Sequence, residues 1–194
     1  MSEIIMINLI KALNELKDRF DGMLSCIETG TIRSYDEHHD STLHISKALG
    51  DKGCLTSVDI NPKSIEISMH ICKEATNVEW VCSDSLEYLK EIQNKKFHFA
   101  FLDTKNDSDF IFEEFNLVFP KIIVGGIIIV DDAGVNYDGD AILTVEQKKG
   151  HKIAKLLKSL GCTNFVRYSP HGTQLWIDIT ESLHKDMYLL QKKG

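Results

Sequence analysis

The sequence predicts an α/β fold in which a mostly parallel sheet is doubly wound, with helices on both faces. Short β-branched runs alternate with segments of helical periodicity along most of the chain. Several of these runs end in an acidic residue followed by turn-forming residues. The length of 194 residues suits one domain with a substantial core. We therefore expect a single domain over residues 1–194.

Seven strands are expected. Apolar, β-branched runs predict five parallel strands near residues 24–28, 55–60, 78–82, 97–103 and 123–131. Two later runs, 164–168 and 174–178, flank the turn Ser169-Pro-His-Gly-Thr173 and predict a hairpin. This hairpin should place one antiparallel strand at an edge of the sheet.

Helices are expected between the strands and at both ends of the chain. Helical periodicity marks residues 4–19, 41–49, 62–75, 84–93, 107–118 and 146–160. Asp40-Ser41, Pro62 and Ser83-Asp84 are typical helix starts, and Gly50, Gly53 and Gly161 stand where helices should stop. The N-terminal segment 1–23 should form a helix over an edge of the sheet, and residues 181–194 a final helix or tail.

The composition predicts a soluble globular protein. The chain is 43% hydrophobic and 26% charged, with a formal net charge of −7, so it has no field suited to nucleic acid phosphates. Five cysteines without a C-x-x-C pair favour a reducing cytoplasm. The N-terminus lacks a secretory pattern, and the longest apolar run, 122–130, is too short to span a bilayer.

Two neighbouring strand ends carry acids that predict a nucleoside pocket. Glu28 lies in Ser25-Cys-Ile-Glu-Thr-Gly-Thr31, and Asp59 lies in Val58-Asp-Ile-Asn-Pro62. In an open α/β sheet, ligands bind beyond the carboxyl ends of the strands, where a glycine allows close approach and an acid can bind a ribose diol. An ordinary strand-to-helix turn at Gly30 and an acid at a helix N-terminus at Asp59 are the structural alternatives.

An ordered set of motifs then resembles the class I S-adenosylmethionine-dependent methyltransferases. The resemblance covers roughly residues 24–178. It rests on Glu28-Thr-Gly-Thr31, Val58-Asp-Ile-Asn-Pro62, Ser83-Asp-Ser85, Phe101-Leu-Asp103 and Gly125-Gly-Ile-Ile-Ile-Val-Asp-Asp132. It implies a Rossmann-like methyltransferase fold, S-adenosylmethionine as cofactor, and methyl transfer to a small molecule, at oxygen. A nicotinamide oxidoreductase is disfavoured because the first motif is not G-x-G-x-x-G.

The resemblance also implies cofactor contacts. Glu28 and Gly30 would lie against the methionine part, and Asp59 and Ile60 against the ribose and adenine. Ser83 and Asp84 correspond to the segment near the adenine edge, although they equally fit a helix cap. Further polar contacts would come from Thr29, Thr31 and Ser41.

A narrower resemblance concerns the divalent-metal O-methyltransferases of the catechol and caffeoyl-coenzyme-A type. It implies that Asp103, Asp131 and Asp132 hold Mg²⁺ or another divalent cation, since oxygen ligands suit such ions. Lys105 matches the lysine that this group places after its first metal ligand and is a candidate general base. Asp132 departs from the usual asparagine. Two alternatives stay open: a related branch that uses these acids without a cation, and a turn rich in Asp and Gly.

Other expectations concern the acceptor and the partners. Residues 32–40 form a polar excursion that suits a lid, and we interpret His38 and His39 as part of that lid rather than as metal ligands. The alternative to an enzyme is a cofactor-binding partner protein of the same fold without turnover. A homodimer is compatible with the sequence, which leaves the oligomeric state and the acceptor open.

Overall fold

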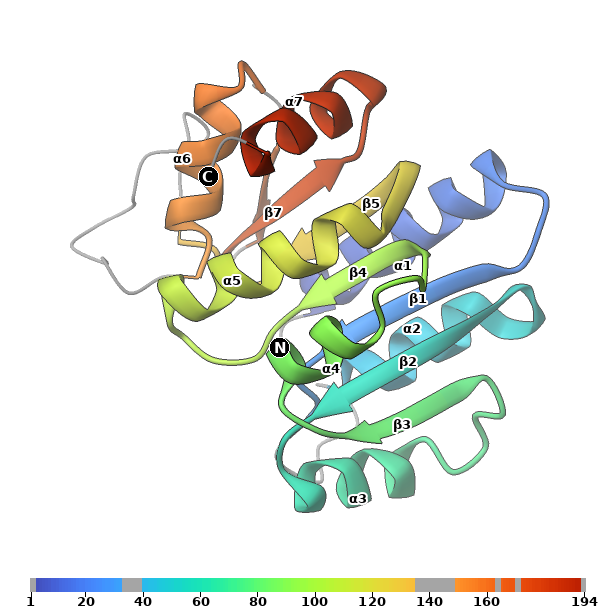
Figure 1. The fold of residues 1–194 in the computed structure, drawn as a ribbon. Coiled ribbons are helices and arrows are strands. Elements are labelled where there is room, and N and C mark those ends of the chain that lie inside the picture. The colour runs from blue at the N-terminus through green and yellow to red at the C-terminus, as the bar shows by residue number, and fades with distance from the viewer. Residues whose placement is uncertain (1–2, 33–39, 135–148, 163–164, 170–171, 193–194) are drawn as a thin grey trace.

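The computed structural model describes residues 3–32, 40–134, 149–162, 165–169 and 172–192. Within these ranges the strands form one sheet in the order β3-β2-β1-β4-β5-β7-β6. The strands are β1 Leu24–Thr29, β2 Gly53–Asp59, β3 Val78–Cys82, β4 Phe97–Leu102, β5 Ile122–Val130, β6 Val166–Ser169 and β7 Gly172–Asp178. The predicted α/β fold with a mostly parallel sheet is confirmed (Figure 1).

The antiparallel strand is β7, which pairs with both β5 and β6. The hairpin therefore closes one side of the sheet as expected, but β6 forms the outer edge and β7 lies inside it. The chain runs from β1 outward through β2 to β3 and then returns to β4 beside β1. Such a reversal of strand order creates a crevice between β1 and β4, beyond their carboxyl ends.

Helices cover both faces of the sheet (Figure 1). One apolar cluster packs α1 and α2 against residues such as Cys26 and Phe99, and the other packs α5, α6 and α7 against residues such as Ile27 and Ala100. The helices are α1 Glu3–Arg19, α2 Ser41–Leu49, α3 Pro62–Ile71, α4 Ser85–Glu91, α5 Ser108–Val118, α6 His151–Ser159 and α7 Glu181–Gln191, with short 3₁₀ turns η2 Gly50–Lys52 and η3 Phe119–Lys121.

Most predicted helix starts are confirmed by side-chain caps. Asp40 caps α2 by accepting from Leu43 N, and Asn61 precedes Pro62 and caps α3. The predicted helix 62–75 ends earlier, because the backbone turns at Cys72. Gly53 follows the 3₁₀ turn η2 as its C-cap and begins β2.

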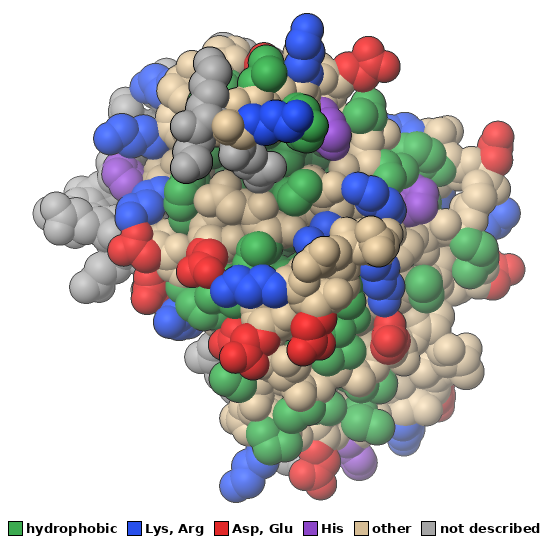
Figure 2. All heavy atoms as spheres, in the orientation of Figure 1, with side chains coloured by type: hydrophobic (Ala, Val, Ile, Leu, Met, Phe, Trp, Pro, Cys, Tyr) green, Lys and Arg blue, Asp and Glu red, His purple; other side chains and the backbone are tan. Residues whose placement is uncertain are grey.

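Charged side chains of both signs are interspersed over the described residues of the face seen in Figure 2. None of the described helices is both long and apolar enough to cross a membrane.

Candidate functional site

A cavity of about 480 Å³ opens beyond the carboxyl ends of β1, β2 and β4. Several of the predicted site residues line it, namely Gly30, Asp59, Ile60, Asp84 and Lys105. They come from different loops that follow the strands, and the sheet order brings them together. This is the edge of an open α/β sheet where ligands bind.

Asp59 ends β2 with both carboxylate oxygens held by backbone amides. Its Oδ2 accepts from Thr31 N at 2.9 Å and from Thr31 Oγ1 at 3.3 Å, and its Oδ1 accepts from Asn61 N at 2.7 Å. These bonds fix the carboxylate while leaving it lone pairs for further donors. The neighbouring Ile60 is 68% exposed, which is unusual for a large apolar side chain. A fixed acid thus lies beside uncovered apolar surface.

Gly30 lies between the end of β2 and the segment that follows β4, which form the two halves of the crevice. Its φ is +85°, and a Cβ atom there would lie 2.4 Å from the backbone oxygen of Asp103. Its N–H donates to Val58 O at 2.8 Å. The close approach of the chain after β4 therefore requires glycine here, whether or not a ligand is bound.

Glu28 does not line the cavity. It is fully buried, and its carboxyl accepts from Ser41 Oγ, from Thr42 Oγ1 at 2.5 Å and from Ser57 Oγ at 3.0 Å. Burial raises the pKa of Glu28 to about 8, with the three hydroxyls acting against the rise. The group is therefore largely protonated at neutral pH. This geometry differs from the predicted contact of Glu28 and Ser41 with the methionine part of a cofactor.

The side-chain alternation of β1 explains this difference. Cys26 packs on the α1–α2 face of the sheet, so Glu28 faces the same side and meets hydroxyls from α2 and β2. Thr29 faces the opposite side and is also fully buried, with its hydroxyl beside Glu114 of α5. Thr29 therefore contributes to the interior and does not line the cavity.

Asp84 caps a helix and also lies at the cavity. Its Oδ1 accepts from Leu86 N at 2.9 Å and from Glu87 N at 3.2 Å, which caps α4. It also lines the cavity. The hydroxyl of Ser83 donates to the backbone oxygen of Asp84 at 3.2 Å and is not among the cavity-lining groups.

The acids after β4 and β5 lie close together, as the sequence predicts. Asp131 is 4% exposed and accepts from Gln174 Nε2 at 2.9 Å. Burial and the neighbouring charge of Asp103 raise the pKa of Asp131 to about 7. The Nζ of Lys149 donates to Asp103 Oδ1. Asp132 follows with a φ of 47°, a left-handed turn conformation.

These residues do not fit a metal site as they stand. A divalent cation would need Asp103, but the ammonium of Lys149 already occupies one of its carboxylate oxygens. Across the described ranges, no group of three or more His, Cys, Asp or Glu side chains is arranged to hold a metal ion. His38 and His39 lie outside the described residues.

Lys105 lines the cavity and has two contacts of its own. Its Nζ lies 3.5 Å from Asp107 Oδ2 and 4.1 Å from the ring centroid of Phe110. Both contacts hold the side chain beside the cavity, where it could meet a polar substrate.

Comparison with known proteins relates part of the chain to a known domain. Residues 40–133 match a family model described as a methyltransferase domain. It is 33% identical over 111 residues to an Arabidopsis thaliana protein provisionally assigned as a caffeoyl-CoA O-methyltransferase, a match that covers 55% of this chain and 45% of that protein. The chain thus spans less than half the length of this relative.

Solved structures share the fold of this chain. A Staphylococcus aureus protein provisionally assigned as a caffeoyl-CoA O-methyltransferase has a TM-score of 0.68 at 15% identity, with 92% of this chain and 84% of that one covered. An O-methyltransferase from Bacillus cereus in complex with SAH has a TM-score of 0.64 at 16% identity, with 91% and 80% covered. These structures confirm the predicted fold, and the family model agrees with the predicted resemblance to the methyltransferases.

Sequence reasoning missed two polar residues that contact the acids after β4 and β5. Lys149 is buried beside Asp103, yet in the sequence it belongs to an ordinary basic pair before Gly150. Gln174 bridges Asp131 and Asn8, which donates to its Oε1 at 2.9 Å. Each contact joins residues far apart in the chain, so only the fold reveals it.

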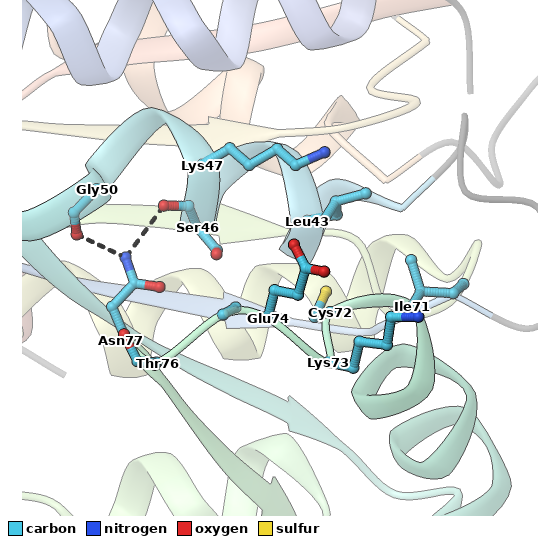
Figure 3. Close-up of a pocket in the computed structure, with 11 residues that line it drawn as sticks. Leu43, Ser46, Lys47, Gly50, Ile71, Cys72, Lys73, Glu74, Thr76 and Asn77 are labelled. Carbon is cyan, nitrogen blue, oxygen red and sulfur yellow. Dashed lines mark hydrogen bonds between the residues drawn. The ribbon is translucent and has the colours of Figure 1, made fainter.

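A second cavity, of about 530 Å³, lies near the amino ends of β2 and β3 (Figure 3). It is bordered by the C-terminal end of α2 and by the segment between α3 and β3. Asn77 Nδ2 closes this region by donating to Ser46 O at 3.0 Å and Gly50 O at 2.9 Å. None of the predicted site residues lines it, and the amino ends of the strands are not where this fold binds ligands.

Proposed function

We propose that this chain transfers a methyl group from S-adenosylmethionine to an oxygen atom of a small molecule. The observation that carries the proposal is the cavity in which fixed Asp59 lies beside exposed Ile60 at the carboxyl end of β2. A carboxylate can accept both hydroxyls of a ribose, and an isoleucine can cover one face of an adenine. The methyltransferase family match and the SAH complex of a structural relative support this assignment.

The reaction asks mainly for alignment. The acceptor oxygen attacks the methyl carbon of the sulfonium, the carbon–sulfur bond breaks, and its electron pair stays on sulfur, which gives S-adenosylhomocysteine. The proton of the acceptor hydroxyl leaves to a base. Because the sulfonium is already activated, holding the three reacting atoms in line and excluding water supplies most of the catalysis. No covalent protein nucleophile is needed.

The cavity residues would divide this work. Asp59 would hold the ribose, Ile60 the adenine, and Asp84 would lie at the edge of the base. Gly30 would let the cofactor pass close to the backbone. Lys105 stays the candidate that orients or deprotonates the acceptor. A divalent cation was predicted to assist at Asp103, Asp131 and Asp132, but the Lys149 contact opposes that set, so no step is assigned to a metal.

The setting of the reaction stays a prediction. The five cysteines are all free thiols, which supports a reducing cytoplasm. A small-molecule acceptor, the absence of a nucleic acid partner and a homodimer are likewise expectations.

Calorimetric titration tests the proposal. S-adenosylmethionine should give saturable heat with one site per chain, and NADH should give none. Asp59→Ala should weaken S-adenosylmethionine about 10- to 100-fold, because hydrogen bonds to a charged group are lost. The matched control is Asp51→Ala, which removes an exposed acid from η2, before the amino end of β2 and away from the cavity. Equal affinity of Asp59→Ala and wild type would disprove the ribose assignment.

Turnover separates the enzyme from a binding protein. Formation of S-adenosylhomocysteine should be followed with a panel of small phenols and catechols as acceptors. Product formation that depends on Asp59 supports the enzyme. Tight cofactor binding with no product across the panel would favour the partner protein without turnover.

A further inference from the structure

Lys149 is a buried cation at the carboxyl ends of β4 and β5. Its side chain is 3% exposed, while that of Asp103 is 25% exposed. Its Nζ donates to Asp103 Oδ1. Lysine is almost never fully buried unless an acid neutralises it, because the desolvation of its charge must be offset.

Two further carboxyl groups feel the charge of Lys149. It acts against the rise in pKa that burial causes at Asp131 and at Glu114. Asp103 follows β4, Asp131 follows β5 and Glu114 lies on α5. One ammonium therefore interacts with acids that come from three different elements. A bound cation would otherwise supply this positive charge.

The backbone that carries Lys149 is held by packing. The N–H of Gly150 donates to Ala133 O at 3.0 Å. A Cβ atom at Gly150 would lie 2.6 Å from the Cβ of Ala133 and 2.8 Å from Leu175 Cδ1. Gly150 also directly precedes α6. The lysine is thus presented from a docked segment at the end of β5.

We propose that Lys149 is a positioning residue that acts as a built-in cation for the Asp103–Asp131 pair, in the place predicted for a divalent metal. The link to methyl transfer rests on the proposed function. A metal ion bound by these acids would have to displace the ammonium or lie beside it, and two positive charges in one partly buried site repel. Methyl transfer at this site should therefore run without a divalent cation.

Manganese binding tests this proposal directly. Wild-type protein, Lys149→Met and the control Lys152→Met should each be titrated with Mn²⁺ and the free ion followed by electron paramagnetic resonance. Lys152 is the matched control because it is 45% exposed and pairs with Asp109 on α5. Lys149→Met should bind Mn²⁺ at least about tenfold more tightly than wild type, since the competing charge is gone. Lys152→Met should behave as wild type.

Two more variants keep the test decisive. Adding Asp103→Asn to Lys149→Met should abolish the gained affinity. Lys149→Gln replaces the methionine variant if that one does not fold, and Lys149→Arg, which keeps the charge, should bind Mn²⁺ as weakly as wild type. The proposal is overturned if folded, neutral variants gain no affinity, or if wild type binds Mn²⁺ tightly and Asp103→Asn abolishes that binding.

Titration of the same samples with S-adenosylmethionine separates the two proposals. If wild type binds the cofactor but also binds Mn²⁺ tightly through Asp103, the cation role of Lys149 fails and the proposed function stands. If the manganese results follow the expectation but no sample binds S-adenosylmethionine, the cation role stands and the proposed function fails.

Discussion

The two halves of the crevice treat their acids in opposite ways. In the β2 half, Asp59 is held by backbone amides and lines an open cavity. In the β4–β5 half, Asp103 is bonded to buried Lys149, and buried Asp131 is bonded to Gln174. Asp59 faces the open cavity with no cation beside it, whereas Asp103 is already paired with an ammonium and Asp131 is buried. The comparison indicates where the cofactor should bind and where a metal should not.

The largest effect is expected at Gly30, where the two halves meet. Gly30→Ala would place a Cβ 2.4 Å from the Asp103 backbone oxygen at a φ of +85°. We expect it to lower the free energy of unfolding by about 3 kcal/mol, from left-handed strain and the clash. Urea denaturation measures this. Gly22→Ala is the control, since a Cβ there meets nothing within 4 Å. Similar stabilities for the two variants would disprove the close approach.

The next effect, about 1.4 kcal/mol for each pH unit, concerns Glu28, a buried acid that lies outside the cavity. The pKa of Glu28 is about 8 in the folded protein, whereas its ordinary value is 4.5. The folded state therefore binds the proton more tightly than the unfolded state. Glu28 alone should therefore lower wild-type stability between pH 4.5 and 8 by up to about 1.4 kcal/mol for each pH unit. Glu28→Gln should lack this contribution, while those of Asp131 and Glu114 remain, and should gain stability relative to wild type as the pH rises.

Denaturation at pH 5, 6, 7 and 8 checks the Glu28 prediction. The exposed Glu66→Gln on α3 is the control and should keep the wild-type slope. Parallel curves for Glu28→Gln and wild type would contradict the buried, raised-pKa carboxyl. The same variant should keep its affinity for S-adenosylmethionine, because Glu28 does not line the cavity. A large loss of affinity would instead support the predicted contact between Glu28 and the methionine part of the cofactor.

The smallest effect is expected at Ile60. Ile60→Ala should leave stability unchanged, because the side chain is 68% exposed. It should weaken S-adenosylmethionine about three- to tenfold through lost apolar contact with the base. Val124→Ala, at a 43% exposed position on β5, is the control. Calorimetry measures both. If Ile60→Ala kept the wild-type affinity, Ile60 would not contact the adenine, and Asp59 would be the main cofactor contact in the β2 half.

The sequence was sufficient for the fold because its strands are strongly patterned. Runs such as Phe97–Leu102 and Ile122–Val130 are apolar and β-branched or aromatic, and the topology then brings their acidic ends to one edge. Helix ends were less certain. The helix from Pro62 stops at Ile71 although apolar periodicity continues, because the local turn at Cys72 outweighs that pattern.

The candidate site was predictable only in part. Asp59 and Gly30 were found because local motifs mark strand ends. The burial of Glu28 depends on which face of β1 it occupies and on hydroxyls from α2 and β2. The partner of Asp103 lies 46 positions later in the chain. No local sequence pattern predicts a contact between residues so far apart. The sequence alone therefore could not distinguish buried Lys149 from the exposed lysines.

The most direct test of the central claim is a titration of wild-type protein with S-adenosylmethionine, first in EDTA and then in excess Mg²⁺. The account predicts one saturable site per chain in both conditions, with dissociation constants that agree within about twofold, because the open half binds the cofactor and Lys149 replaces the cation. Absence of binding, or binding that requires Mg²⁺, would contradict it.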